Sequence, residues 1–458
     1  MNNALQQYID LYKSHREALE AHAPAAMNEL RAEALEVLEE GHLPHRGEEN
    51  YEVSDIEEMY APDYGVNINR VNLGADAAEA FRCDVPNMST WMYFFFNDVF
   101  KASRKSPSLP ADVVVEPFSE AAERHPEILN RYLGSVAPHS DVRVALNTLL
   151  GQEGLLVYVP KNVELERPIQ LVNIMNAGGP IMAVRRVLVV IGENAKAQML
   201  VCDHTQNTDH NFLVNQVVEI VAETNAHFDY YDIEESTEKT RRTTAHYVKQ
   251  AAGSNVLLNG ITLTNGITRN DFVVSVDGEG AETHLYGMAI EGGKQQIDNY
   301  TYISHNVGHC KSNELFKYVL DEQSTGGFTG RIMVAEGANK IEAYQSNRNV
   351  VATDTAKIHT KPQLEIYCDD VKCSHGTAIG QLDQDAIFYM QARGITREEA
   401  RTMLMQAFMS DVIDTVRMES LKNRLQRLVE KRFCGQLHQC SDCSNSCREV
   451  VKGADQHK

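Results

Sequence analysis

A change in residue pattern near Leu150 limits what this chain can fold into more than any other feature of its sequence. From there, short segments rich in Val, Ile, Thr and Tyr follow one another for over 200 residues, separated by Gly, Asn and Asp. Segments of this composition and length are typical of β-strands. Long apolar patterns with a helical period disappear over the same stretch. The central part of the chain is therefore predicted to be mainly β.

Within this part, a strand, a short turn that ends in alanine and a second strand recur. The turns end at Ala195, Ala226, Ala281 and Ala338, whose separations are 31, 55 and 57 residues. These separations fit one or two turns of a coil with 27 to 31 residues per turn. A stack of such coils is a parallel β-helix. A β-sandwich is the alternative, but it needs more hairpin signals than the single strong dipeptide Asn265-Gly266.

Both ends of the chain are predicted to be helical. Leu5, Tyr8 and Tyr12 recur with helical spacing near the start. Thr396-Arg-Glu-Glu399 has the pattern of a capping box and begins another amphipathic stretch. We predict four parts: an N-terminal helical region (1–110), a β-helix core (111–380), a C-terminal helical region (381–433) and a Cys-rich tail (434–458).

Composition excludes several classes of partner and location. The chain has 458 residues, 43 basic against 64 acidic, and a net charge of -21. Nucleic acids and anionic membranes attract basic surfaces, so neither is an expected partner. The most apolar run, Val187–Ile191, is far shorter than the ~20 residues of a membrane span and is interpreted as a buried strand. Without a signal-peptide pattern, the expected location is the cytoplasm, where the nine cysteines would be reduced thiols or metal ligands.

One short stretch of the predicted β-region combines a thiol with an imidazole. Leu364, Ile366 and Cys368 alternate as on a half-buried strand, and Cys373 and His375 follow. Two residues apart on a strand, Cys373 and His375 would share a face about 7 Å apart, while Cys368 would point the other way unless a bulge intervenes. Thiolate and imidazole suit iron or zinc, but two ligands need a second chain or a substrate to complete a site. The alternative is structural, with a buried cysteine as a small hydrophobe and a hydrogen-bonded histidine.

The tail holds a second group of possible metal ligands. Cys434, Cys440, Cys443 and Cys447 have the spacing C-x5-C-x2-C-x3-C. Four cysteines so close in sequence can wrap zinc or an iron–sulfur cluster. The polar residues between them cannot form a core, so the alternative is a flexible tail of free thiols. The tail is therefore either a metal-binding appendage or such a thiol tail.

Several motifs between residues 300 and 400 occur in a characteristic order. They are His305-Asn-Val-Gly-His-Cys-Lys-Ser-Asn-Glu-Leu-Phe-Lys317, Phe328-Thr-Gly330, Gln345-Ser-Asn347, Thr360-Lys-Pro-Gln-Leu-Glu-Ile366, Asp369-Asp-Val-Lys-Cys-Ser-His-Gly376 and Phe388-Tyr-Met-Gln-Ala-Arg-Gly-Ile395. In these motifs the chain resembles the SufD family, the scaffold subunit of the SUF iron–sulfur cluster assembly machine. The resemblance is weaker over residues 150–300 and faint in the N-terminal region, where it rests mainly on Leu43-Pro-His-Arg46 and Glu49.

The resemblance implies a fold, partners and a site. It implies a right-handed parallel β-helix flanked by helical regions, which pairs with a SufB-like paralogue and binds the SufC ATPase. The nascent iron–sulfur cluster would be built near the interface with SufB. The family's Cys-x-His falls on Cys373 and His375, of which the histidine would lie near ligands that SufB contributes. The C-terminal helices would be the SufC docking element, or their apolar face could be ordinary core.

The expected role is that of a scaffold and not of an enzyme. Gly326-Gly-Phe-Thr-Gly330 lacks the spacing of a phosphate-binding loop and is interpreted as a coil turn, so ATP chemistry is expected on another chain. One alternative is a stand-alone β-helix lyase or hydrolase, but the adjacent Asp369 and Asp370 would face opposite sides of a strand. Another is a thiol metal-binding protein built on the tail.

Overall fold

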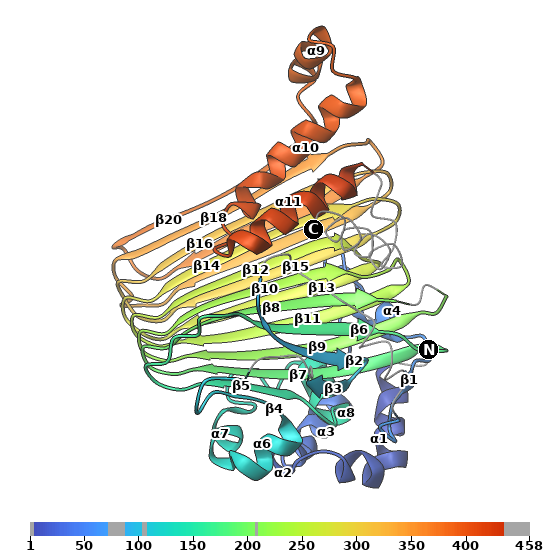
Figure 1. The fold of residues 1–458 in the computed structure, drawn as a ribbon, viewed down its shortest axis with the longest axis vertical. Helices are drawn as coiled ribbons and strands as arrows, with labels where there is room; N and C mark the ends of the chain where they lie inside the picture. Colours follow the sequence, from blue (N-terminus) through green and yellow to red (C-terminus); the bar gives the residue numbers. More distant parts are fainter. Residues whose placement is uncertain (1–3, 72–87, 103–107, 207–208, 435–458) are drawn as a thin grey trace, which may run out of the picture.

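Two stacked β-sheets form the body of the protein in the computed structural model, which describes residues 4–71, 88–102, 108–206 and 209–434 (Figure 1). From β7 to β18, each strand pairs in parallel with the strands two before and two after it in the chain. The chain therefore alternates between the two sheets as it winds. The mainly β class and the parallel β-helix with flanking helices are confirmed.

The first sheet is built mostly from odd-numbered strands. In spatial order they are β19 (Lys357–Ile366), β17 (Thr325–Val334), β15 (Gln296–His305), β13 (Ile267–Val276), β11 (Thr240–Gln250), β9 (Phe212–Ala222), β7 (Ile181–Ile191), β5 (Leu155–Val159) and β4 (Val114–Pro117), with β1 (Gly65–Val66) on β7.

The second sheet is built mostly from even-numbered strands. In spatial order they are β20 (Val371–Gly380), β18 (Ile341–Val351), β16 (Lys311–Leu320), β14 (Glu282–Glu291), β12 (Asn255–Thr264), β10 (His227–Glu235), β8 (Lys196–Thr205), β6 (Ile169–Met175), β2 (Trp91–Phe96) and β3 (Val99–Ala102).

A single kind of turn, repeated from coil to coil, leads from the first sheet to the second. It contains a residue with positive φ followed by a fully buried small residue; these pairs are Asn194–Ala195, Asn225–Ala226, Gly253–Ser254, Gly280–Ala281, His309–Cys310 and Gly337–Ala338. Asn and Gly tolerate positive φ best, and a small side chain fits beneath the turn. The buried residues are 31, 28, 27, 29 and 28 residues apart, so the predicted coil length is confirmed. Cys310 occupies a position where other coils have Ala or Ser.

The space between the sheets, here called the lumen, is filled by every second residue of each strand. Along one side it is apolar, with Val, Leu, Ile and Phe from successive coils in contact. This burial of apolar surface is the main stabilising contribution that stacked coils can make. Val187–Ile191 lies in β7 and is fully buried, as predicted.

Most helices of the N-terminal half lie at one end of the solenoid, opposite β20, and the short helix Ile56–Tyr60 lies beside the sheets (Figure 1). The helices of this half are α1 (Ala4–Ala21), α2 (Ala25–Asn28), α3 (Arg31–Glu40), α4 (Ile56–Tyr60), α6 (Phe118–Arg124), α7 (Pro126–Tyr132) and α8 (Val142–Leu150). Leu5, Tyr8 and Tyr12 of α1 are buried in the core that joins these helices to the outer faces of β7 and β9. The predicted helical periodicity of this region is confirmed there.

Not all of the predicted helical region 1–110 is helical. Trp91–Phe96 forms β2, which pairs in parallel with β6 and is buried on both faces, and β3 follows it. A continuous apolar run has no period that separates strand from helix. Conversely, α6, α7 and α8 lie within residues 111–380. The ranges of the four parts stay a prediction.

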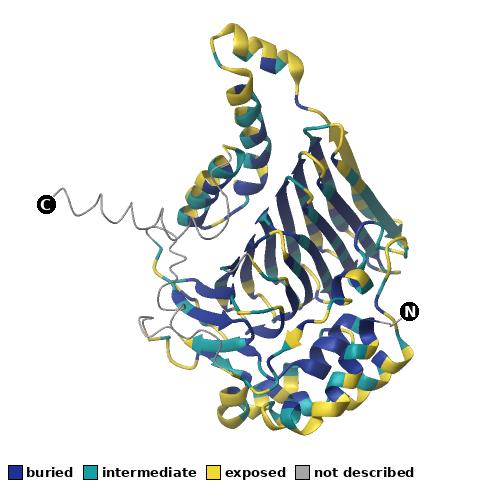
Figure 2. Ribbon diagram, turned by 90° about the vertical axis from the view of Figure 1, so that its right-hand side faces the viewer, coloured by how far each residue is buried: buried dark blue, intermediate teal, exposed yellow. Residues whose placement is uncertain are grey.

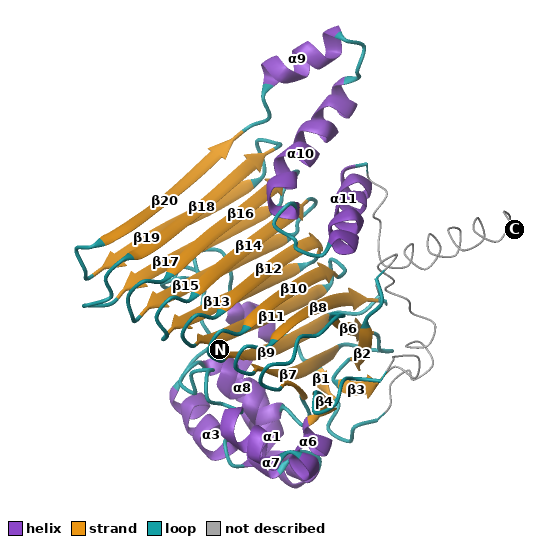
Figure 3. Ribbon diagram, turned by 60° about the vertical axis from the view of Figure 1, so that its left-hand side comes forward, coloured by secondary structure: helices purple, strands orange, loops and turns teal. Residues whose placement is uncertain are grey.

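Three helices follow the last strand: α9 (Gln384–Ala392), α10 (Arg397–Ile413) and α11 (Glu419–Phe433). The predicted capping box is present, with Thr396 accepting from the Glu399 amide and Glu399 accepting from the Thr396 amide. α10 packs over β14 and β16 and α11 over β12, while α9 projects beyond the sheets (Figure 3). The buried Lys317 of β16 holds α10 by donating to the Phe408 carbonyl at 2.8 Å and pairing with Asp411. None of the helices within the described ranges is long and apolar enough to cross a membrane.

Two sequence-based interpretations of local structure are wrong. Gly326–Gly330 lies inside β17 and is not a coil turn. The stretch from Leu364 to Gly376 is not one strand, because β19 ends at Ile366 and β20 begins at Val371. Cys368 lies in the turn between them and packs, partly buried, against the same apolar core as Cys373. Strand alternation does not extend through a turn, so the expected opposite orientation of the two cysteines is wrong.

Candidate functional site

The last coil of the solenoid is open. β19 pairs only with β17 and β20 only with β18, so each strand has one edge without a neighbour among the described strands. Nearly every residue of β20 is exposed, in contrast to the strands beneath it (Figure 2). An exposed strand edge presents unpaired backbone groups to which another strand can bind. This end coil, residues 357–380, is therefore a candidate contact surface for a second chain.

Cys373 and His375 lie together on this end coil. Both face the lumen side, since Cys373 packs against the apolar core and His375 is two residues further along β20. Their register partners on β18, Ala343 and Gln345, are both buried. Cys373 is half-buried next to Ala343 of β18, and burial raises the pKa of its thiol above the ordinary value. The thiol is therefore protonated at neutral pH in the chain alone, and removal of its proton would need a metal ion or a neighbouring cation.

His375 is exposed, and its side chain makes no hydrogen bond within the described ranges. Its register neighbour on β18 is Gln345, which is buried. The imidazole thus lies at the mouth of the lumen, where both solvent and a partner chain can reach it. An imidazole in such a position can bind a borderline metal ion.

Large apolar side chains surround the open end. Tyr367 is 64% exposed and Ile379 55% exposed, and Tyr344 and Ile366 are also exposed. Exposed aromatic and aliphatic side chains that gather next to an unpaired strand edge are characteristic of protein contact surfaces. The end coil therefore has both the backbone and the side chains of an interface.

The described residues contain no group of three or more His, Cys, Asp or Glu side chains that could hold a metal ion. Cys373 and His375 remain a pair, so any metal site there needs ligands from elsewhere. Of the tail cysteines, Cys434 is exposed at the end of α11, and Cys440, Cys443 and Cys447 lie outside the described residues. The metal-binding tail stays a prediction.

The aspartates considered for hydrolytic chemistry are surface groups. Asp369 and Asp370 lie in the turn between β19 and β20. Asp370 forms an ion pair of 2.5 Å with the exposed Lys340. Paired carboxylates of a hydrolase must converge on one bond, and these two do not share a cleft.

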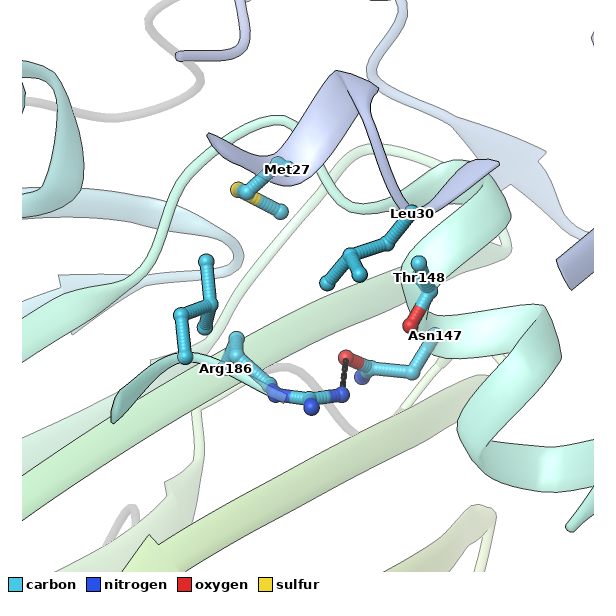
Figure 4. A pocket seen from close by; sticks show the side chains of 6 residues that line it. Met27, Leu30, Asn147, Thr148 and Arg186 are labelled. Atoms are coloured by element: carbon cyan, nitrogen blue, oxygen red, sulfur yellow. Dashed lines mark hydrogen bonds between the residues drawn. The ribbon is translucent and has the colours of Figure 1, made fainter. Parts of the chain in front are cut away.

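Neither cavity resembles a small-molecule site. One, of about 10 Å³, lies between the N-terminal helices and β7, where Arg186 donates to Asn147 at 3.4 Å (Figure 4). It has room for about one water molecule. The other, of about 260 Å³, lies where residues 52–53 cross β17 and β19, and it is bounded by the ion pair of Glu52 with Lys361 at 2.9 Å. The first cavity is too small for a small-molecule ligand. The lysine that borders the second already pairs with Glu52 and is not free to bind one.

Charged side chains fill much of the other side of the lumen. Arg242 of β11 pairs with Asp203 at 3.2 Å and with Asp232 at 2.6 Å, and Arg185 pairs with Asp203 at 2.8 Å. Burial alone would raise the pKa of Asp232, but Arg242 and His246 outweigh it and lower the value to about 2. These ion pairs link side chains of successive coils in the interior of the protein.

The sequence reasoning missed two polar lumen residues directly beneath the open end. Gln345 and Glu314 follow His375 downward in register, on β18 and β16. Both lie within the motifs that carry the family resemblance, yet nothing in their own spacing connects them with His375. Only the stacking of successive coils brings the three side chains into one column.

Comparison with known families and proteins agrees with this geometry. A family model described as the SufBD core domain of SUF system FeS cluster assembly matches residues 173–408, and a model of the SufBD protein N-terminal region matches residues 2–171. An iron-sulfur cluster assembly SufBD family protein of Synechocystis is 30% identical over 411 residues, 88% of this chain and 90% of that protein. The iron-sulfur cluster assembly protein SufD of Escherichia coli is 34% identical over 173 residues, 38% of this chain and 41% of its own length. SufD of Bacillus subtilis is 23% identical over 331 residues, 70% of this chain and 74% of its own length.

Proposed function

The chain belongs to the SufBD family of SUF-system iron–sulfur cluster assembly proteins, and we propose that it is a non-catalytic scaffold subunit of the SufD type. In this role it pairs with a SufB-like paralogue and docks a SufC-type ABC ATPase in the cytoplasm. The nascent iron–sulfur cluster is the cargo of the complex and not a resident cofactor of this chain.

The open end coil is the observation that carries the proposal. β19 and β20 keep one free edge each, and exposed apolar side chains lie beside them. A paralogue built from the same coils could add its own terminal strands to these edges, which would satisfy the backbone groups and cover Tyr367 and Ile379. The shared interface would then contain Cys373 and His375.

The chemistry of the pair fits a shared site. His375 would contribute an imidazole next to cluster ligands from the partner, and Cys373, whose thiol is held neutral by burial, would have a lesser role. Because this chain supplies only two of the ligands, the partner must supply the others. The site would then be complete only in the assembled complex. An incomplete site also suits a cluster that must be released.

The exposed part of the C-terminal helices supports the docking of the ATPase. Most apolar residues of α10 and α11 are buried against the second sheet, so this part of the helices is ordinary core. On α9, Phe388 is 73% exposed and Tyr389 58% exposed, and the helix projects away from the sheets (Figure 1). Aromatic side chains on a projecting helix are suitable anchors for another protein.

Co-expression of the chain with a SufB-like protein and a SufC-like ATPase tests the proposal. We expect the three to purify together, and we expect His375→Ala to leave the complex intact while the yield of assembled cluster falls severalfold. His227→Ala is the matched control, because His227 is also an exposed strand histidine but lies on β10, five coils from the end.

Two results would count against the proposal. A chain that stays alone at micromolar concentration with both candidates present would not be a scaffold subunit. An unchanged cluster yield in His375→Ala, with the complex intact, would remove His375 from the site.

A further inference from the structure

Two columns of side chains face each other across the lumen beneath the open end. On β16, β18 and β20, Glu314, Gln345 and His375 are register partners in successive coils. On β15, β17 and β19, the corresponding register partners are Thr301, Gly330 and Pro362. Strands in a sheet are about 4.8 Å apart, so side chains in register can touch from coil to coil.

The lower part of the first column is hydrogen-bonded. The Thr301 hydroxyl donates to Glu314 Oε2 at 2.8 Å, and the Gln345 side-chain amide donates to the same oxygen at 3.1 Å. Burial raises the pKa of Glu314 to about 7, and above this pH the ionised carboxylate can only accept, so it binds the NH₂ end of the Gln345 amide and not the carbonyl end. The carboxylate thereby fixes the orientation of the amide.

The other end of this amide is left without a partner. Gln345 is 3% exposed, and its Oε1 atom is buried without a hydrogen bond in the part of the chain that the structure describes. An unpaired buried acceptor destabilises the fold, so it should have a partner in the working state. His375, its register neighbour in the last coil, is the histidine of β20, and its imidazole makes no hydrogen bond in that described part.

The column is shaped to hold the amide in place. A Cβ atom at Gly330, opposite Gln345, would lie 2.4 Å from Gln345 Nε2 and 2.8 Å from its Cδ. Glycine at this position therefore makes room for the amide. Gly330 of β17, which contributes nothing to a phosphate site, has this packing role instead.

We propose that Gln345 is a positioning residue for His375, accepting a hydrogen bond from the imidazole through its Oε1 atom while Glu314 holds the amide from below. A neutral imidazole has one donor and one acceptor nitrogen. If the donor nitrogen is bound by Gln345, the lone pair of the other nitrogen faces the open end and any cluster or metal ion there. An outer partner of this kind commonly orients histidine ligands in metal sites. The inference rests on the proposed function of the end coil and names the residue that prepares its histidine.

The test is the ring tautomer of His375 in the full chain, measured by NMR after selective ¹⁵N labelling of histidine. The His375 signals are assigned by their loss in His375→Gln. A net hydrogen bond of ordinary strength predicts that one tautomer is favoured about threefold to tenfold. In Gln345→Met, which keeps the length of the side chain but removes the amide, we expect this preference to fall to that of an exposed histidine such as His227.

Two further variants separate positioning from general damage to the lumen. In Glu314→Gln the new side-chain amide can both donate and accept, so it no longer holds the Gln345 amide in one orientation. The tautomer preference of His375 should therefore decrease. Asn347→Leu is the control, because Asn347 is buried on the same face of β18 but outside the column. Thermal unfolding verifies that each variant folds. If Gln345→Met does not fold, the tautomer ratio of His375 in Glu314→Gln tests the inference instead.

The same tautomer ratio in wild type, Gln345→Met and Glu314→Gln would overturn the inference. A change of the same size in Asn347→Leu would also overturn it, since the effect would then be general. Because the measurement uses the chain alone and no cluster, it is independent of the cluster yield in His375→Ala. The positioning of His375 and the function proposed for the end coil can therefore fail separately.

Discussion

Buried glutamates that form no ion pair among the described residues make the lumen sensitive to pH. Burial raises the pKa of Glu291 to about 8, more than Arg432 lowers it, and burial raises the pKa of Glu314 to about 7. Both carboxyl oxygens of Glu291 are buried without a hydrogen bond in the described part of the chain. The folded state thus holds these protons more tightly than the unfolded state, in which a glutamate has a pKa of about 4.3.

The expected consequence is a loss of stability with rising pH. The contribution of Glu291 is fully present below about pH 4.3 and is lost as the pH rises through about 8, on the order of a few kcal/mol in total. Glu291→Gln should therefore reduce the fall in the free energy of unfolding between pH 5.5 and 8.5, measured by urea denaturation. Glu336→Gln, at an exposed turn, is the control. Equal pH slopes for wild type and Glu291→Gln would contradict the account.

Some single-residue features could be predicted from the sequence and others could not. The shared face of Cys373 and His375 follows from strand alternation, and the buried alanines follow from their spacing. Gln345 could not be placed beneath His375, because coils of 27 to 31 residues have no fixed length from which to count register. The orientation of Cys368 depends on the turn between β19 and β20, and the neighbouring residues contain no pattern that predicts this turn.

At the scale of elements, α9 is a helix whose apolar side chains are mostly not buried by the rest of the chain. Ile387 is its only buried residue, while Phe388 and Tyr389 lie exposed on it. We expect the double substitution Phe388→Ser and Tyr389→Ser to weaken binding of the SufC-type ATPase at least tenfold, because exposed aromatic anchors dominate such contacts. Calorimetric titration of the ATPase into the chain measures this change.

The same double variant should keep its thermal stability and its binding to the SufB-like partner. Met405→Ser, buried on the core side of α10, is the contrasting variant and should lower stability instead. Undiminished ATPase binding by the α9 variant would exclude α9 as the docking element.

The Cys-rich tail is predicted to hold metal independently of the end coil. Truncation after Phe433 removes Cys434, Cys440, Cys443 and Cys447 but leaves α11 complete. If the tail binds zinc or an iron–sulfur cluster, anaerobically purified full-length chain should contain about one more site equivalent of metal than the truncated chain. Elemental analysis measures the difference, and equal metal content would contradict the prediction.

The helical and β elements were predicted with unequal success for physical reasons. The capping box at Thr396 is a local hydrogen-bond pattern, so four residues were enough to predict it. The strand β2 has no such signal, since Trp91–Phe96 is buried on both faces and its apolar run suits either structure. Its identity as a strand is fixed by pairing with β6, which lies over 70 residues away.

At the scale of the whole molecule, the two ends of the solenoid differ. The first coils are covered by the N-terminal helices, whereas the last coil is left open with the Cys373–His375 pair at its mouth (Figures 1 and 2). A parallel β-helix requires a cap at each end to protect its edges and its core. The account's central claim is that a SufB-like partner provides this second cap and thereby completes the site.

Amide hydrogen exchange of the chain, alone and with the SufB-like partner, tests this claim most directly. Exchange of free edge strands is fast, and pairing with a second chain slows it. The account predicts that peptides covering β19 and β20 become strongly protected only in the complex, while peptides from β8 and β10 stay unchanged. A complex that forms with β19 and β20 exchanging as fast as in the free chain would contradict it.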